Sequence, residues 1–127
     1  MTVMIIDDAV TVRMMTKTFL QDLGFTQIRV AENGVEALEL LEGLESLDLV
    51  LVDWNMPYMN GLDFIQNLRT KPGFQDTKIL MITTETAMEK VIEALEAGAN
   101  EYMMKPFNKE MLINKLQILG LNVPTCP

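Results

Sequence analysis

Two hydrophobic periods alternate along the chain, and this alternation constrains the fold more than any other feature of the sequence. Segments between and after the strand-like runs have apolar residues three and four positions apart, as in Val12, Met15 and Phe19, which is the pattern of an amphipathic helix. Strands that alternate with helices indicate βαβ units and a parallel sheet covered on both faces. The sequence therefore predicts an α/β fold of the (βα)5 type. The apolar runs typical of strands are residues 3–6, 28–30, 47–52, 79–82 and 102–104.

Residues that begin or end helices agree with this periodicity. Asn33 with Glu36, and Asn60 with Asp63, have the spacing of an N-cap residue followed by an acidic third position. Glycines follow four helical stretches, where a left-handed C-terminal cap is expected. These glycines are Gly24, Gly43, Gly98 and Gly120.

Composition limits the classes of function. A chain of 127 residues with 49% hydrophobic residues is long enough for one domain with its own core. A net charge of -8 disfavours binding to nucleic acid, and no apolar span is long enough to cross a membrane. There is no secretory signal and only one cysteine, Cys126, so we expect a cytoplasmic protein. We expect residues 1–120 to form the domain and residues 121–127 a short tail with no output domain.

Polar side chains stand where the predicted strands end. In open parallel sheets, ligands bind beyond the carboxyl ends of the strands, so these side chains should lie along one functional edge. They are Asp7 and Asp8 after the first strand, Asp53 after the third, Thr83 after the fourth, and Lys105 with Pro106 after the fifth.

Three neighbouring carboxylates favour a magnesium site. At about 4 Å and an effective dielectric constant near 20, one pair of carboxylates costs roughly 4 kcal/mol, which a divalent cation would remove. Mg²⁺ typically takes one or two carboxylates and keeps several waters, so we expect Asp8 and Asp53 to bind it directly and Asp7 through water. The hydroxyl of Thr83 and the ammonium of Lys105 then suit a phosphoryl group, with Asp53 as its acceptor.

Other interpretations of these residues stay open at this point. Asp7 and Asp8 could cap the first helix, Asp53 could be a turn residue, and Lys105 could be a solvated charge. A metal-dependent phosphatase would usually have an acid two residues after the nucleophile, where this chain has Asn55. A flavodoxin-like cofactor carrier would have a Ser, Thr and Gly-rich loop after the first strand, where this chain has two acids.

The motifs IIDD, DWNMP followed by NG, and GANEYMMKPF resemble the receiver domain of two-component response regulators over about residues 2–119. Within that family the pattern is similar to stand-alone chemotaxis receivers of the CheY type. The resemblance implies strand order 2-1-3-4-5 and Mg²⁺-dependent phosphorylation of Asp53 by a histidine kinase. It also implies that the backbone carbonyl of Asn55 binds Mg²⁺, that Thr83 and Lys105 contact the phosphoryl group, and that the bond before Pro106 is cis. Thr83 and Tyr102 would be the switch residues.

The resemblance also implies how the signal ends and where it goes. Asn55 and Glu85 would tune dephosphorylation, and their combination predicts a short-lived signal, although the bulk of Thr84 could restrict access of water. We expect a monomeric signalling switch that catalyses only its own phosphoryl transfer and autodephosphorylation. Its surface formed by the fourth helix, fifth strand and fifth helix would bind a flagellar motor switch protein, and a phosphatase is a possible further partner. The alternative is a phosphorelay intermediate or a phosphate sink.

Overall fold

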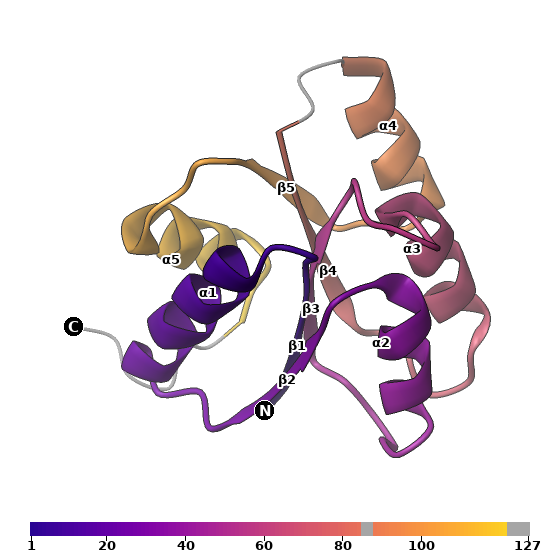
Figure 1. The fold of residues 1–127 in the computed structure, drawn as a ribbon, viewed down its shortest axis with the longest axis horizontal. Helices are drawn as coiled ribbons and strands as arrows, with labels where there is room; N and C mark the ends of the chain where they lie inside the picture. Colours follow the sequence, from indigo (N-terminus) through magenta and orange to yellow (C-terminus); the bar gives the residue numbers. More distant parts are fainter. Residues whose placement is uncertain (85–87, 122–127) are drawn as a thin grey trace.

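A computed structural model of the chain describes residues 1–84 and 88–121, which form alternating strands and helices around one sheet (Figure 1). The strands are β1 (Thr2–Ile6), β2 (Gln27–Ala31), β3 (Leu49–Asp53), β4 (Lys78–Thr83) and β5 (Glu101–Met104). The helices are α1 (Val10–Asp22), α2 (Gly34–Leu41), α3 (Gly61–Thr70), α4 (Met88–Ala97) and α5 (Lys109–Ile118). This order confirms the (βα)5 prediction.

The strands are all parallel and lie in the order β2-β1-β3-β4-β5. Asp53 pairs with Ile82 and Thr83 pairs with Met104, so Asp53 and Thr83 stand at the carboxyl ends of neighbouring strands. The amide of Asp7, just beyond β1, donates a hydrogen bond to the carbonyl of Ala31 (3.1 Å). The sheet order therefore brings the predicted strand-end residues to one edge.

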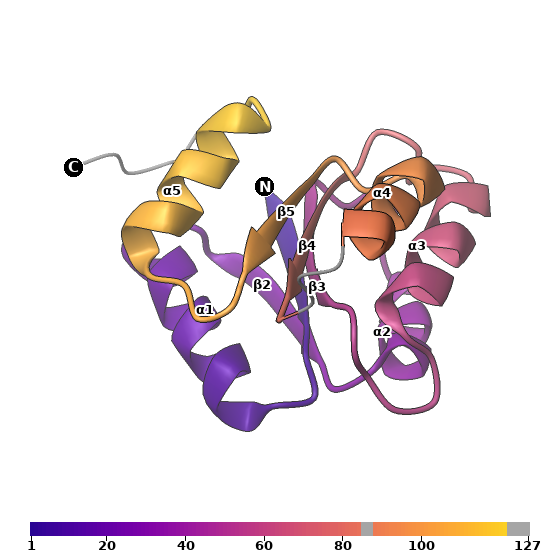
Figure 2. The same cartoon turned by 90° about the horizontal axis from the view of Figure 1, so that it is seen from above.

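Helices cover both faces of the sheet, with α1 and α5 on one face and α2, α3 and α4 on the other (Figures 1 and 2). Alternate residues of β1 enter the two cores: Val3 and Ile5 pack toward α1 and α5, whereas Met4 and Ile6 pack in the opposite layer. All five residues of β3 are buried, as expected for a central parallel strand. None of the helices in the described part of the chain is long and apolar enough to span a membrane.

Local signals placed most of the helix ends correctly. The side chains of Asn33 and Asn60 accept hydrogen bonds from the amides of Glu36 (2.8 Å) and Asp63 (2.9 Å), which confirms both predicted N-caps. The prediction for Gly43 was wrong, because α2 ends in a right-handed turn at Glu42 and Gly43 lacks a positive φ. The other predicted cap glycines, Gly24, Gly98 and Gly120, do have positive φ.

Candidate functional site

Three carboxylates meet where β1 and β3 end. Asp7 and Asp53 are buried and Asp8 is exposed, and one carboxylate oxygen from each lies within 4.8 Å of the others. Carboxylate oxygens are the ligands that Mg²⁺ prefers, and these oxygens are close enough to contribute to one hydrated ion. The donor set therefore fits a magnesium ion, with Asp8 on its solvent side.

Lys105 reaches this cluster from the end of β5. Its Nζ lies 2.7 Å from Oδ2 of Asp7 and 3.4 Å from Oδ2 of Asp53. The amide of Lys105 donates a hydrogen bond to the carbonyl of Thr83 (2.9 Å), and the peptide bond between Lys105 and Pro106 is cis. The ammonium is thus held among the carboxylates and is not a solvated surface charge.

Burial and neighbouring charges change the acidity of the site. Burial raises the pKa of Asp53 from 3.8 to about 6; the charge of Lys105 opposes this rise, and the charges of Asp7 and Asp8 add to it. Burial alone would lower the pKa of Lys105, but its hydrogen bond to Asp7 and the charges of both carboxylates outweigh this effect and raise that pKa. A cation bound by the carboxylates would counter the rise at Asp53.

Asp7 is fixed from two sides, and one of its partners was missed by the sequence analysis. Its Oδ1 accepts a hydrogen bond from the amide of Ala9 (2.9 Å), and its backbone carbonyl accepts one from Nη1 of Arg13 (2.7 Å). Ala9 is the N-cap residue of α1 and has no side-chain cap, so the alternative that an aspartate caps this helix is wrong. Arg13 gave no signal in the sequence because its bond depends on the fold of the β1–α1 turn.

The loop after Asp53 is held close to the site by Gly61. The amide of Gly61 donates to the carbonyl of Trp54 (2.9 Å), and a Cβ at Gly61 would collide with the carbonyl oxygen of Asp53. Asn55 is exposed in this loop. Glu85, the other residue predicted to tune dephosphorylation, lies outside the described residues. Gly61 therefore allows α3 to start against the strand end that carries Asp53.

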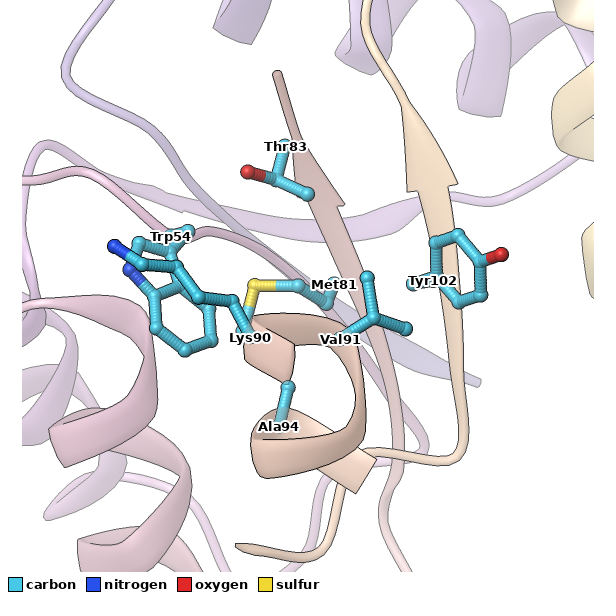
Figure 3. Close-up of a pocket in the computed structure, with 7 residues that line it drawn as sticks. All are labelled: Trp54, Met81, Thr83, Lys90, Val91, Ala94 and Tyr102. Carbon is cyan, nitrogen blue, oxygen red and sulfur yellow. The ribbon is translucent and has the colours of Figure 1, made fainter. Parts of the chain in front are cut away.

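A small apolar cavity lies below Thr83, between β4, β5 and α4 (Figure 3). Trp54, Thr83 and Tyr102 line it together with residues of α4, and Thr83 is buried. The ammonium of Lys90 lies 5.7 Å from the centre of the Trp54 ring. The Tyr102 ring is half-buried, and Nζ of Lys115 lies 5.3 Å from the centre of this ring. The Tyr102 hydroxyl points away from Thr83 in Figure 3. The cavity thus lies between Trp54 and Thr83 on one side and residues of α4 and β5 on the other.

Fold and site together define a receiver-type (βα)5 module, and comparison with known proteins agrees. The family described as response regulator receiver domain matches residues 3–117, so the chain belongs to this family. It is 42% identical over 123 residues to chemotaxis protein CheY1 of Helicobacter pylori, covering 96% of this chain and 99% of that protein. It is 41% identical over 116 residues to chemotaxis protein CheY-3 of Vibrio cholerae, covering 91% of this chain and 88% of that protein.

Solved structures give the same result. The chemotaxis response regulator CheY4 of Vibrio cholerae is 37% identical, with a TM-score of 0.86 over 93% of this chain and 97% of that chain. A CheY-like receiver domain protein from Methanospirillum hungatei is 30% identical, with a TM-score of 0.82 over 94% of this chain and 93% of that chain. Response regulators of this type are signalling switches and not enzymes in the ordinary sense.

Proposed function

We propose that this protein is a chemotaxis response regulator in which Asp53 accepts a phosphoryl group from a histidine kinase. The observation that carries the proposal is the buried carboxylate of Asp53, which stands at a strand end 3.4 Å from the Lys105 ammonium and beside Asp7 and Asp8. A nucleophile, a fixed cation and an acidic donor set at one edge are the parts that phosphoryl transfer requires.

The proposed step is a transfer from a phosphohistidine. An oxygen of the Asp53 carboxylate forms a bond to phosphorus while the phosphorus–nitrogen bond breaks, and the bonding electron pair returns to the imidazole nitrogen, which takes up a proton. Lys105 and the Thr83 hydroxyl stabilise negative charge on the phosphoryl oxygens. The raised pKa of Asp53 is consistent with a carboxylate that is best kept ionised by a bound cation.

The proposed metal ligands are Asp8, Asp53 and the backbone carbonyl of Asn55, with Asp7 acting through water. When bound, Mg²⁺ would neutralise charge on the carboxylates and on the transferred group. Asp7 is already engaged by Lys105 at 2.7 Å, and this contact supports an indirect role for it at the metal. Asn55 is two residues after Asp53 and is exposed, which supports the proposed role of its side chain in tuning the approach of water. The same role is proposed for Glu85 from its position two residues after Thr83 in the sequence.

The proposed output is a change in the surface formed by α4, β5 and α5. Movement of Thr83 toward the phosphoryl group would open space for Tyr102 to turn into the cavity between them. Met88, Ile92 and Leu95 form an exposed apolar stripe on α4, four and three residues apart, which supports a role for this surface in protein binding. The kinase and a flagellar motor switch protein are the proposed partners, and the receiver unit is residues 1–120.

The direct test uses acetyl phosphate as a small phosphodonor with Mg²⁺. We expect a mass increase of one phosphoryl group, and a change in the fluorescence of Trp54, first with Mg²⁺ and again with the donor. Asp53→Asn should keep the fold and lose both the mass increase and the second fluorescence change, because an amide is not a nucleophile. A labile phosphate retained at full stoichiometry in Asp53→Asn would place the acceptor elsewhere.

A further inference from the structure

Tyr58 has the most unusual backbone of any non-glycine residue in the described part of the chain. Its φ is +69°, and the amide of Met59 donates a hydrogen bond to the carbonyl of Pro57 (2.7 Å), so Tyr58 is the centre of a strained, positive-φ γ-turn. A bulky residue rarely adopts this conformation. Its side chain is 88% exposed, so packing of the ring does not compensate for the strain. Folding therefore gains nothing evident from a tyrosine at this position.

The turn is pinned beside the start of α2. A Cβ on Gly34 would lie 2.9 Å from Sδ of Met59, which means that the loop and the helix are already in close contact at this point. An open groove runs between them, and it is lined by Asn33, Val35, Glu36, Glu39 and Tyr58. Val35 is 41% exposed, so the groove offers an aliphatic and an aromatic side chain to solvent. The aromatic ring is thus displayed on a supported loop at the mouth of a preformed groove.

The charged residues that line the groove, Glu36 and Glu39, are both acidic. Residues 30–68, which include α2, β3 and the Tyr58 loop, contain eight acidic residues and no lysine or arginine. The chain as a whole has a net charge of -8, so this one segment carries a charge as large as that of the entire protein. Among the described residues, the cations of Arg13 and Lys105 reach acids of this segment, at Glu32 (3.7 Å) and at Asp53 (3.4 Å) respectively. Neither of these acids lines the groove. The eight residues are Glu32, Glu36, Glu39, Glu42, Glu45, Asp48, Asp53 and Asp63.

We infer that the Tyr58 groove is a docking surface for a basic, arginine-containing segment of a partner protein. A guanidinium can stack on the exposed Tyr58 ring while Glu36 and Glu39, three residues apart on one face of α2, pair with neighbouring cations. Val35 supplies the apolar contact between these polar ones. None of the residues that line the groove belongs to α4, β5 or α5, so its occupant does not compete with a partner on that surface.

The test is a titration of the full chain with a short helical peptide that has arginines along one face and leucines beside them. The amide chemical shifts of the chain are measured during the titration. We expect shifts at residues 33–39 and 55–60, and an affinity at least about fivefold weaker for Tyr58→Asn, which loses the ring. Tyr58→Phe should keep the affinity, because the ring remains. Glu36→Gln with Glu39→Gln should weaken binding, whereas the matched pair Glu93→Gln with Glu96→Gln on α4 should not.

A second measurement separates docking from folding. Because asparagine tolerates positive φ, Tyr58→Asn should melt at a higher temperature than the wild type while binding the peptide more weakly. Absence of shifts in the groove, shifts spread equally over α4, or unchanged affinity in Tyr58→Asn would each overturn the inference. It does not rest on phosphorylation: Tyr58→Asn should be phosphorylated by acetyl phosphate as well as the wild type, so the two proposals fail separately.

Discussion

Lys105 and Asp7 stand 98 residues apart in the chain, yet their side chains form a hydrogen-bonded ion pair of 2.7 Å. The pair exists because β1, β3 and β4 lie side by side and β5 follows at the edge, so that the loops after β1 and β5 converge over the end of β3. With Asp53 3.4 Å from the same ammonium, one cation partly balances two buried carboxylates. In the metal-free protein, this ion pairing contributes to the stability of the fold and to the pKa of Asp53.

Removal of the Lys105 ammonium should destabilise the metal-free protein. Lys105→Met leaves Asp7 and Asp53 without their cation, so we expect a loss of roughly 2 kcal/mol in the free energy of unfolding, partly restored by Mg²⁺. Urea denaturation with and without Mg²⁺ measures this loss. Lys109→Met is the matched control, since the pair of Lys109 with Asp22 (3.3 Å) is exposed; equal losses in the two variants would contradict the role of Lys105.

Asp8 should contribute more to metal affinity than to folding. Asp8→Ala removes the exposed carboxylate of the cluster, so we expect Mg²⁺ to bind at least about tenfold more weakly and the metal-free fold to become more stable as repulsion falls. Titration of Trp54 fluorescence with Mg²⁺ measures the affinity. Asp22→Ala serves as the control, because Asp22 is an exposed carboxylate on α1 away from the cluster. An unchanged Mg²⁺ affinity in Asp8→Ala would show that Asp8 is not a metal ligand.

The metal-free protein should lose stability as pH rises through the titration of Asp53. The folded-state pKa of about 6 lies above the ordinary value of 3.8, so the folded protein binds this proton more tightly than the unfolded chain does. The resulting stabilisation is complete below the lower value and is lost as pH rises through the higher one. In a chelator, the stability of wild type relative to Asp53→Asn should therefore fall between about pH 4 and about pH 7. A constant difference would show that burial does not raise this pKa.

Gly61 should tolerate no larger side chain. Gly61→Ala would push a methyl group into the carbonyl oxygen of Asp53 and within 3.1 Å of the Trp54 Cα, so we expect a loss of about 1 to 3 kcal/mol and slower phosphorylation by acetyl phosphate. Gly43→Ala is the control, because its nearest contact, the Leu40 carbonyl oxygen at 3.8 Å, leaves room for a methyl group. Wild-type stability and phosphorylation rate in Gly61→Ala would contradict this steric argument.

Arg69 should support the fold and not the phosphorylation site. Its guanidinium donates hydrogen bonds to the carbonyls of Gly98 (2.7 Å), Phe74 (3.1 Å) and Gln75 (3.0 Å), which join the end of α3 to two loops at the edge opposite the site. Arg69→Met should cost about 2 to 4 kcal/mol while leaving the folded protein able to accept phosphate. Thermal melts and mass spectrometry test both parts. Arg29→Met, an exposed position on β2, should change neither quantity.

The sequence by itself determined the elements and the set of strand-end residues. Apolar periodicity and the pairs Asn33 with Glu36 and Asn60 with Asp63 act within a few residues, so they can be recognised without a partner elsewhere in the chain. The same signals placed Asp53 at the end of β3, and the known ligand rule for parallel sheets turned it into a site candidate. Gly43 was expected to form a left-handed cap, but α2 ends in a right-handed turn at Glu42, which residue type alone does not reveal.

Only the tertiary structure decided which polar side chains meet. Lys105 reaches Asp7, Arg13 binds the Asp7 carbonyl, and Arg69 joins three carbonyls, because each long side chain finds a partner that strand order and loop shape bring near. The position of Tyr58 beside Glu36 and Glu39 of α2 likewise depends on the tertiary structure. Local sequence contains no record of such distant neighbours, since their positions follow from the packing of the whole sheet.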